Sequence, residues 1–483
     1  RDTYRDVALE TLDAMASGGL YDHVGGGFHR YCVDREWTVP HFEKMLYDNA
    51  EIPRAFLAGY RLTGEGRYAE IARETFAFVD RELTHPDGGF YSTLDAESED
   101  STGSREEGAF YVWTPETVRE AVDDPTAAEL FCKRYGVTDS GNFENETTVL
   151  TESTPVGELA ADAVMDTDSV EELLDAARSQ LFEARESRSR PPRDGKVLAG
   201  WNGLMISALA EGALALDAEY ADHAEAALDF CRDRLWEDGG DESEAVGHLD
   251  RRFERGEVGI PGYLEDYAYL GRGAFDLYQA TGDVEHLEFA LELGRAIRES
   301  FYDDSAGTLY FTPTGGEELI ARPQQLADSS TPSSTGVAVQ LLAALSAFAP
   351  DAGFDAVADS VLETHAPTLE SDPISHTSLA LAAVDRSVGT PELTVAAEEL
   401  PAAWRETLSK TYLPGRILSV RPPTESGLSA WLDALGLEGA PPIWADRQAV
   451  DDRETVYACR SFTCSPPSHD VEDAIEWLRD AGN

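Results

Sequence analysis

The chain has 483 residues and a formal net charge of -54, because 92 acidic residues outnumber 38 basic ones. Such a surface repels nucleic acid and anionic membranes, so neither is an expected partner. Hydrophobic residues make up 42% of the chain, which is enough to bury a large core. The acids are spread over every segment and are not gathered at metal-ligand spacing. This favours adaptation to a high-salt cytoplasm, where ions screen the self-repulsion, over metal storage.

The five cysteines are odd in number and scattered, apart from Cys459 and Cys464. They do not form the disulfide framework of a small secreted domain. No apolar run reaches the length of a membrane span and no signal peptide is visible, so a cytoplasmic location is expected. The spacing of Cys459 and Cys464 is too wide for a thioredoxin-like motif. A buried pair at strand ends is the favoured interpretation, and a redox partner role stays open.

Apolar residues at helical spacing predict the first elements of the chain. Pro40 is expected to open a helix that runs through Leu62, with Lys44 and Asp48 on one helical face. Three regions are expected to be non-helical: a strand at 90–92, a mobile acidic loop at 93–108 and a strand at 110–113. Other helices are expected at 2–16, 67–83, 115–122, 127–135 and 169–185.

A unit of two helices and a glycine-bearing hairpin recurs along the chain and indicates stacked helical hairpins. The leading helices are rich in small residues, whereas the trailing ones, at 221–236 and 284–301, are charged on one face. Leading helices therefore belong inside and trailing ones outside. The pattern predicts a mainly α fold, an α/α toroid over residues 1–388. Residues 389–483 are expected to form a small α/β appendage, with strands at 393–395, 417–420 and 455–458 and helices at 400–411, 427–435 and 471–481.

The stretch from Gly18 to Asp48 is unusually dense in histidine, arginine, carboxylate and aromatic residues. It and three later polar stretches precede or open inner helices, whose starts share one rim in a toroid. These residues are therefore expected to line one mouth. The candidate catalytic residues are His41, Glu43, Asp48, Glu265 and Asp266. The candidate substrate-binding residues are His23, His29, Arg30, Trp37, Trp113, Trp201 and Asn202. Further candidates are His376 and three acids that could reach the mouth, Asp95, Glu97 and Glu107.

The segment GGLYDHVGGGFHRYCVDREWTVPHFEKMLYDNA resembles the signature of the YyaL / spermatogenesis-associated protein 20 family of thioredoxin-domain-containing proteins. Four later segments resemble that family too: EGAFYVWT, RPPRDGKVLAGWNGLMI, LEDYAYL and YACRSFTCSPP. The resemblance implies a thioredoxin-like domain followed by a helical toroid. This chain begins inside the toroid, so the thioredoxin-like domain and the opening inner helix are expected to be absent, and no redox role passes to these residues.

Toroids of this kind resemble the six-hairpin glycosidases and the N-acylglucosamine 2-epimerase group, an (α/α)6 architecture. Glycosidases need two opposed carboxylates, and sugar epimerases use histidines as acid and base. One hypothesis is a carbohydrate-active or sugar-binding toroid that acts on a small-molecule ligand. The other is a non-catalytic toroid that binds a ligand or protein for a thioredoxin-like domain in redox or quality-control work. No cofactor is expected, and the spacing of His23, His29 and His41 matches no standard zinc pattern, so no metal is expected.

Overall fold

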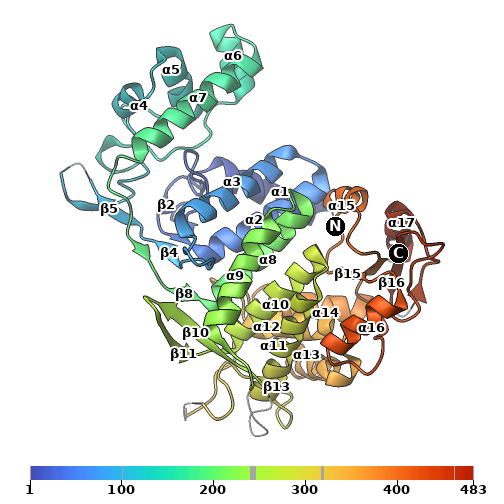
Figure 1. Cartoon of the computed structure of the whole chain (residues 1–483). Coiled ribbons are helices and arrows are strands. Elements are labelled where there is room, and N and C mark those ends of the chain that lie inside the picture. Colours follow the sequence, from blue (N-terminus) through green and yellow to red (C-terminus); the bar gives the residue numbers. More distant parts are fainter. Residues whose placement is uncertain (1, 101, 240–245, 317–319, 462, 482–483) are drawn as a thin grey trace. The chain divides into compact units, whose positions relative to one another are not determined.

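The computed structural model describes residues 2–100, 102–239, 246–316, 320–461 and 463–481. The chain folds into two compact units, whose elements are labelled in Figure 1. Unit 1 comprises Arg1–Tyr60, Glu65–Thr84 and Tyr91–Gly195. Unit 2 comprises Arg61–Gly64, His85–Phe90 and Lys196–Asn483. The boundary expected after residue 388 lies inside unit 2 and stays a prediction.

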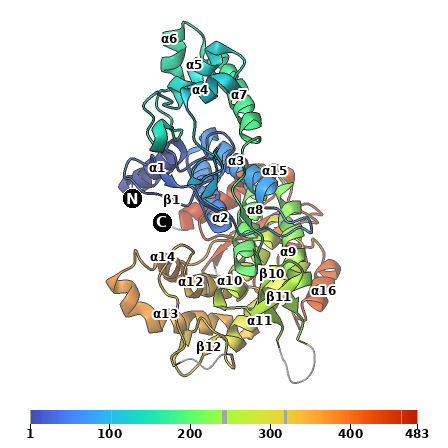
Figure 2. The ribbon, with the colours of Figure 1, turned by 90° about the vertical axis from the view of Figure 1, so that its left-hand side faces the viewer.

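Unit 1 opens with three helices at the predicted places: α1 (Asp2–Ser17), α2 (Leu46–Thr63, whose last residues belong to unit 2) and α3 (Gly66–Leu83). A second group of helices lies together in Figure 2. These helices pack around one apolar core that contains Trp113, Phe131 and Leu181. The members of this group are α4 (Pro115–Ala121), α5 (Pro125–Arg134), α6 (Val156–Ala163) and α7 (Thr167–Arg185). The helix α6 was not predicted.

Short strands connect the helices of unit 1. The strands β1 (Tyr31–Cys32) and β2 (Pro40–His41) form a hairpin. Another hairpin joins β5 (Glu97–Glu99) to β6 (Arg105–Glu107). A three-stranded antiparallel sheet contains β3 (Lys44–Met45), β4 (Thr93–Leu94) and β7 (Arg193–Asp194). A short 3-10 turn, η1, covers Glu144–Glu146.

Four local predictions in unit 1 were wrong. Residues 40–45 are extended, not helical, and α2 begins only at Leu46. The expected mobile loop at 93–108 contains three strands, whereas Phe110 and Tyr111 lie in a turn. The strand expected at 90–92 is not formed, since β4 starts at Thr93. The strands β3, β4 and β7 pair although they are distant in sequence, and that pairing overrides the local signal. The hairpin of β5 and β6 is a local pairing.

Unit 2 contains the helical hairpins in the predicted inner and outer layers. The inner helices are α8 (Ala199–Ala215), α10 (Leu264–Thr281) and α12 (Ser334–Leu345), and α10 packs against both others. The outer helices α9 (Tyr220–Leu235), α11 (Val284–Ser300) and α13 (Phe354–Ser371) each pack on the inner helix before them. A Cβ on Gly203 would lie 2.3 Å from the backbone carbon of Tyr269, so a glycine is required where α8 meets α10.

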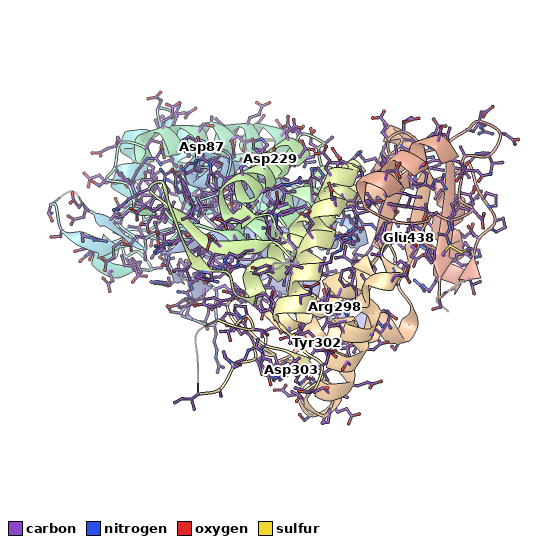
Figure 3. All side chains as sticks on the ribbon, turned by 60° about the horizontal axis from the view of Figure 1, so that its bottom comes forward. Asp87, Asp229, Arg298, Tyr302, Asp303 and Glu438 are labelled. Carbon is purple, nitrogen blue, oxygen red and sulfur yellow. A yellow bond between two sulfur atoms is a disulfide. The ribbon has the colours of Figure 1, made fainter. Side chains whose placement is uncertain are left out.

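Short strands and turns accompany these hairpins. The strands β8 (Val197–Leu198), β9 (Trp236–Glu237) and β11 (Glu257–Pro261) all pair with β10 (His248–Glu254). The strands β12 (Tyr302–Asp303) and β13 (Thr308–Leu309) form a hairpin. The 3-10 turn η2 (Pro350–Ala352) and the helix α14 (Thr377–Val388) complete this part. The labelled carboxylates Asp87, Asp229, Asp303 and Glu438 come from different segments of unit 2 (Figure 3).

The C-terminal segment contains a four-stranded sheet of order β15-β14-β16-β17. Its strands are β14 (Glu392–Ala396), β15 (Ile417–Arg421), β16 (Thr455–Arg460) and β17 (Thr463–Cys464), and only β14 and β15 run parallel. Its helices are α15 (Ala402–Ser409), α16 (Glu425–Ala434) and α17 (Val471–Ala481). The three strands and three helices predicted here are confirmed. Cys459 and Cys464 lie opposite each other on β16 and β17 and form a disulfide, although Cys464 is exposed.

The predicted mainly α class is therefore confirmed. Within the parts of the chain that the structure describes, no helix has both the length and the apolar character needed to cross a membrane.

Candidate functional site

The hairpin of β1 and β2 carries an exposed aromatic ring beside a histidine. Tyr31 and His41 are directly opposed in the register of the two strands. Cross-strand neighbours share one face of a hairpin, and here the two rings stack with centroids 5.2 Å apart. Tyr31 is 50% exposed. The pair therefore presents a flat surface to solvent next to a titratable group.

His41 lies between two carboxylates. Its Nδ1 is 2.7 Å from Oε1 of Glu107 on β6, and its Nε2 is 3.7 Å from Oε2 of Glu43. Arg30 donates a hydrogen bond from Nη1 to the same Glu43 oxygen at 3.1 Å. A carboxylate at one ring nitrogen of a histidine orients the ring and leaves the other nitrogen to exchange a proton. Arg30, His41 and Glu43 were predicted site residues, and the structure brings them together with Glu107.

Asp48, in the first turn of α2, belongs to the same group of charges. Its Oδ2 is buried and has no hydrogen-bond partner. Burial raises the pKa of Asp48 to about 8; the Arg30 guanidinium opposes this increase and Glu43 adds to it. A carboxyl group with this pKa carries a proton at neutral pH and can act as a general acid. We refer to Arg30, His41, Glu43, Asp48 and Glu107 as the acid–base cluster.

His23 and His29 lie in the core of unit 1. Nε2 of His23 is 2.9 Å from the carbonyl oxygen of Gly18, and Nδ1 of His29 is 3.0 Å from that of Phe42. Burial lowers the pKa of both side chains, that of His29 to about 3, so both rings are neutral. The two rings hold backbone segments together, and their expected part in substrate binding stays a prediction.

The three candidate tryptophans lie in different settings. Trp113 is buried in the core of the second helical group, with the Arg188 guanidinium 3.9 Å from its ring centroid. No face of this ring is open to a sugar. Trp37 is half-buried at a backbone φ of 59°, and Trp201 is half-buried in the first turn of α8. Roles for Trp37 and Trp201 in binding stay predictions.

In unit 2, Glu265 and Asp266 form an ion-paired group at the start of α10. Arg251 Nη1 donates to Glu265 at 2.6 Å and to Asp266 at 2.8 Å. Asp266 also accepts hydrogen bonds from the backbone N–H groups of Gly200 and Tyr263. Burial raises the pKa of Asp266 to about 6, against the opposing effect of Arg251. The two carboxylates are therefore brought together, and the expectation that they share one mouth with residues of unit 1 stays a prediction.

Asn202 has a structural task in the same unit. Its Oδ1 accepts the backbone N–H of Phe90 at 2.7 Å, while its Nδ2 donates to the carbonyl oxygens of Phe90 and Leu198. Both of its N–H donors are thus committed to backbone. His376, another candidate, precedes α14 and contacts the carbonyl oxygen of Asp372 with its Nδ1 at 2.8 Å.

Unit 1 also contains a buried group of charged residues that was not predicted from the sequence. Lys44 donates to Asp22 Oδ2 at 2.8 Å, and Arg185 donates to both oxygens of the same carboxylate at 2.8 and 3.0 Å. Lys44 therefore pairs with Asp22. The expectation that Lys44 and Asp48 share one helical face was wrong, because Lys44 lies in β3 and α2 begins at Leu46. The sequence signal was only the scarcity of lysine, since Lys44 is one of four in the chain. Among the described residues, no His, Cys, Asp and Glu side chains gather in a group that could hold a metal ion.

The fold places the chain in the class of mainly α proteins built from helical hairpins. No family model matches it. Spermatogenesis-associated protein 20 of Homo sapiens is 30% identical over 497 residues, which cover 96% of this chain and 62% of that protein. The Mus musculus protein of the same name is 29% identical over 96% of this chain and 61% of its own length. The chain belongs to this family and spans about three fifths of the length of the relatives it matches.

Solved structures similar to this chain include a sugar epimerase from a ruminal bacterium, at 12% identity and a TM-score of 0.44, covering 72% of this chain and 66% of that one. Cellobiose 2-epimerase from Spirochaeta thermophila DSM 6192 has 13% identity and a TM-score of 0.45, covering 77% of this chain and 72% of that one. Neither likeness carries an argument about activity.

Proposed function

We propose that this protein is a carbohydrate-active enzyme that moves a proton at a carbon next to a sugar carbonyl, with the acid–base cluster as its active site. The observation that carries the proposal is the position of His41 between the carboxylates of Glu43 and Glu107, together with the buried, partnerless Oδ2 of Asp48, whose pKa responds to Arg30 and Glu43. Acid and base groups with different protonation states in one site are the requirement for such chemistry.

Each member of the cluster has a task in this proposal. His41 takes the proton from the carbon next to the carbonyl, while Asp48 gives its proton to the carbonyl oxygen. The electrons of the broken C–H bond form the C=C bond of an enediol. Return of a proton to the opposite face of the same carbon completes an epimerisation, and its return to the former carbonyl carbon completes an isomerisation. In both cases the enediol hydroxyl that becomes the carbonyl gives its proton back to the carboxylate of Asp48. Arg30 is positioned to hold an oxygen atom of the substrate. The exposed ring of Tyr31 offers a flat surface for stacking on a sugar.

Deuterium exchange tests this chemistry directly. The protein is incubated in D2O and molar KCl with neutral aldoses, ketoses and disaccharides, and deuterium at carbon is followed by mass spectrometry. We expect exchange with at least one sugar, and a loss of roughly 100-fold or more in His41→Asn and Asp48→Asn, the range typical of general acid–base catalysis. Glu43→Gln should also lose activity because it no longer pairs with His41.

Glu97→Gln is the matched control. Glu97 lies opposite Glu107 in the β5–β6 register, but its carboxylate pairs with Arg105 at 3.4 Å and not with His41. This variant should retain full exchange. Absence of exchange across the panel, hydrolysis without exchange, or full activity in both His41→Asn and Asp48→Asn would each overturn the proposal.

The second hypothesis from the sequence is a non-catalytic toroid that serves a thioredoxin-like domain. One observation favours it: the Arg447 guanidinium lies 3.0 and 3.2 Å from the two sulfur atoms of the disulfide, and a cation there stabilises a thiolate. If this hypothesis holds, an added thioredoxin-like protein with one active cysteine should form a mixed disulfide with Cys464. Cys464→Ser should abolish this product. No mixed disulfide in the wild-type protein would exclude the role.

A further inference from the structure

Unit 1 contains a cavity of about 240 Å³ whose wall is rich in cations. Five basic side chains line it: Lys44, Arg81, Arg185, Arg190 and Arg193. Two acidic side chains, Asp22 and Glu82, accompany them. The chain as a whole has more than twice as many acids as bases. The cavity therefore inverts the charge of the protein that surrounds it.

We refer to the buried residues Asp22, Lys44 and Arg185 as the floor of the cavity. The two cations of this floor exceed the single negative charge of Asp22. Asp22, Lys44 and Arg185 are at most 5% exposed at their side chains. Burial opposes the charge of Asp22, but Arg185 and Lys44 outweigh it and hold the pKa of Asp22 well below its usual range. One carboxylate thus faces two cations. A buried charge without a counter-charge costs several kcal/mol, so an added anion would stabilise this floor.

The wall around this floor adds three more arginines. Arg81 and Arg190 both contact Glu82, and Arg190 also pairs with Glu186, so these two cations are partly balanced. Arg193 donates to the backbone carbonyl of Glu82 and lies over the Tyr91 ring at 4.1 Å. Neither of these two contacts supplies Arg193 with a negative charge.

Two further features indicate a bound molecule and its shape. Nε of Arg185 is buried and has no hydrogen-bond partner, although Arg185 lines the cavity and is 3% exposed. An unsatisfied buried donor is costly unless a ligand accepts from it. Phe78, Phe110, Tyr111 and Leu94 supply the apolar part of the lining. Cations and apolar walls in one cavity suit a molecule with a charged end and an organic body.

We propose that this cavity binds a small organic phosphate monoester, with its phosphate over Lys44 and Arg185 and within reach of Arg190 and Arg193. The excess of cations matches a group that carries close to two negative charges at neutral pH, as a phosphate monoester does. A carboxylate carries only one. Guanidinium groups also match phosphate in geometry, since their parallel N–H donors bind two oxygens at once. This site is separate from the acid–base cluster and does not depend on the proposed function.

Calorimetric titration at fixed KCl concentration tests the site with four probes: a hexose 6-phosphate, inorganic phosphate, a hexuronate and a neutral hexose. We expect the hexose phosphate to bind at least 10-fold more tightly than the other three. Arg193→Gln and Arg190→Gln should each weaken its binding by about 10-fold or more. Both arginines are exposed residues, Arg190 with 47% of its side chain, so these variants should fold, which a thermal melt checks.

Arg67→Gln is the matched control, because it removes one partly exposed arginine of unit 1 that pairs with Glu152 and does not line the cavity. Its affinity for the hexose phosphate should equal that of the wild type. Equal binding of the hexuronate would overturn the phosphate assignment, and equal binding of inorganic phosphate would overturn the organic part. Absence of binding by the hexose phosphate, or full affinity in both cavity variants, would overturn the site itself.

Discussion

At the scale of single residues, surroundings decide the protonation of two carboxylates in opposite ways. Asp22 is fully buried, yet Arg185 and Lys44 hold its pKa well below the usual range. Asp48 has a buried oxygen without a partner, and the nearby Arg30 already pairs with Glu43, so burial raises its pKa to about 8. The same type of side chain is therefore ionised at one position and protonated at neutral pH at the other.

Asp48→Asn should stabilise the protein in a pH-dependent way. The folded-state pKa of about 8 exceeds the value near 4 of an unfolded chain. The proton on Asp48 therefore contributes stability that is complete below about pH 4 and is lost as the pH rises through 8. Asparagine stays neutral throughout, so the gain in free energy of unfolding should grow with pH, from about 1 kcal/mol at pH 5 to about 5 kcal/mol at pH 8. Urea unfolding at both pH values measures it.

Asp95→Asn serves as the control for this experiment. Asp95 is 44% exposed at its side chain and pairs with Arg105 at 3.0 Å, so its substitution should have the same small effect at both pH values. An Asp48→Asn gain that does not grow between pH 5 and pH 8 would contradict the assigned pKa.

At the scale of elements, one device recurs at the start of two helices. Asn49 of α2 accepts the backbone N–H of Phe28 and donates to the carbonyl oxygens of Phe28 and Met45. Asn202 of α8 makes the same three bonds with Phe90 and Leu198. Both asparagines are fully buried. Each one therefore ties the start of a helix to a loop that comes much earlier in the chain.

Asn49→Asp and Asn202→Asp should each lower the free energy of unfolding by about 2–4 kcal/mol, because two carbonyl oxygens lose their donor and a charge is buried. Chemical denaturation measures the loss. Hydrogen exchange should quicken in the loop that contains Phe28 or Phe90. Asn145→Asp is the control with the same change in charge at an exposed residue, and it should cost less than about 0.5 kcal/mol. Equal losses in all three variants would contradict the assigned role.

At the scale of the whole molecule, the net charge of -54 makes self-repulsion the dominant long-range force. Acids outnumber bases in the chain as a whole, so most surface carboxylates lack a cation to pair with. The Debye length falls from about 10 Å at 0.1 M salt to about 3 Å at 1 M, which removes most repulsion between separate surface charges. The cavity of unit 1 differs from the rest of the chain, because basic side chains outnumber acidic ones in its lining.

The melting temperature should rise by roughly 10 °C between 0.1 and 2 M KCl, with most of the increase below about 0.5 M, where screening changes fastest. Differential scanning calorimetry over a KCl series measures this. Sucrose at matched osmolality is the control, because it adds no ions and should not reproduce the early increase. A melting temperature that does not change with KCl would contradict adaptation to high salt.

The sequence by itself determined the helices and the C-terminal strands. Two kinds of local pattern identify these elements: the helical periodicity of α1, α3, α9 and α11, and the apolar runs of β14, β15 and β16. Each pattern involves only residues that are a few positions apart in the sequence. The same reasoning identified His41, Glu43, Asp48 and Arg30 as one group, because they lie within 19 consecutive residues. Secondary structure and groups of residues that are close in sequence can thus be predicted from the sequence alone.

Only the tertiary structure decided which charges meet and which are buried. Lys44 finds Asp22 at a separation of 22 residues, and Arg185 reaches the same carboxylate from 163 residues away. The helix expected from Pro40 is lost because residues 40–45 pair with β1 and β4 instead. Burial and long-range pairing depend on segments distant in sequence, and electrostatic energy depends steeply on both. For that reason the cationic cavity and the raised pKa of Asp48 could not be predicted from local patterns.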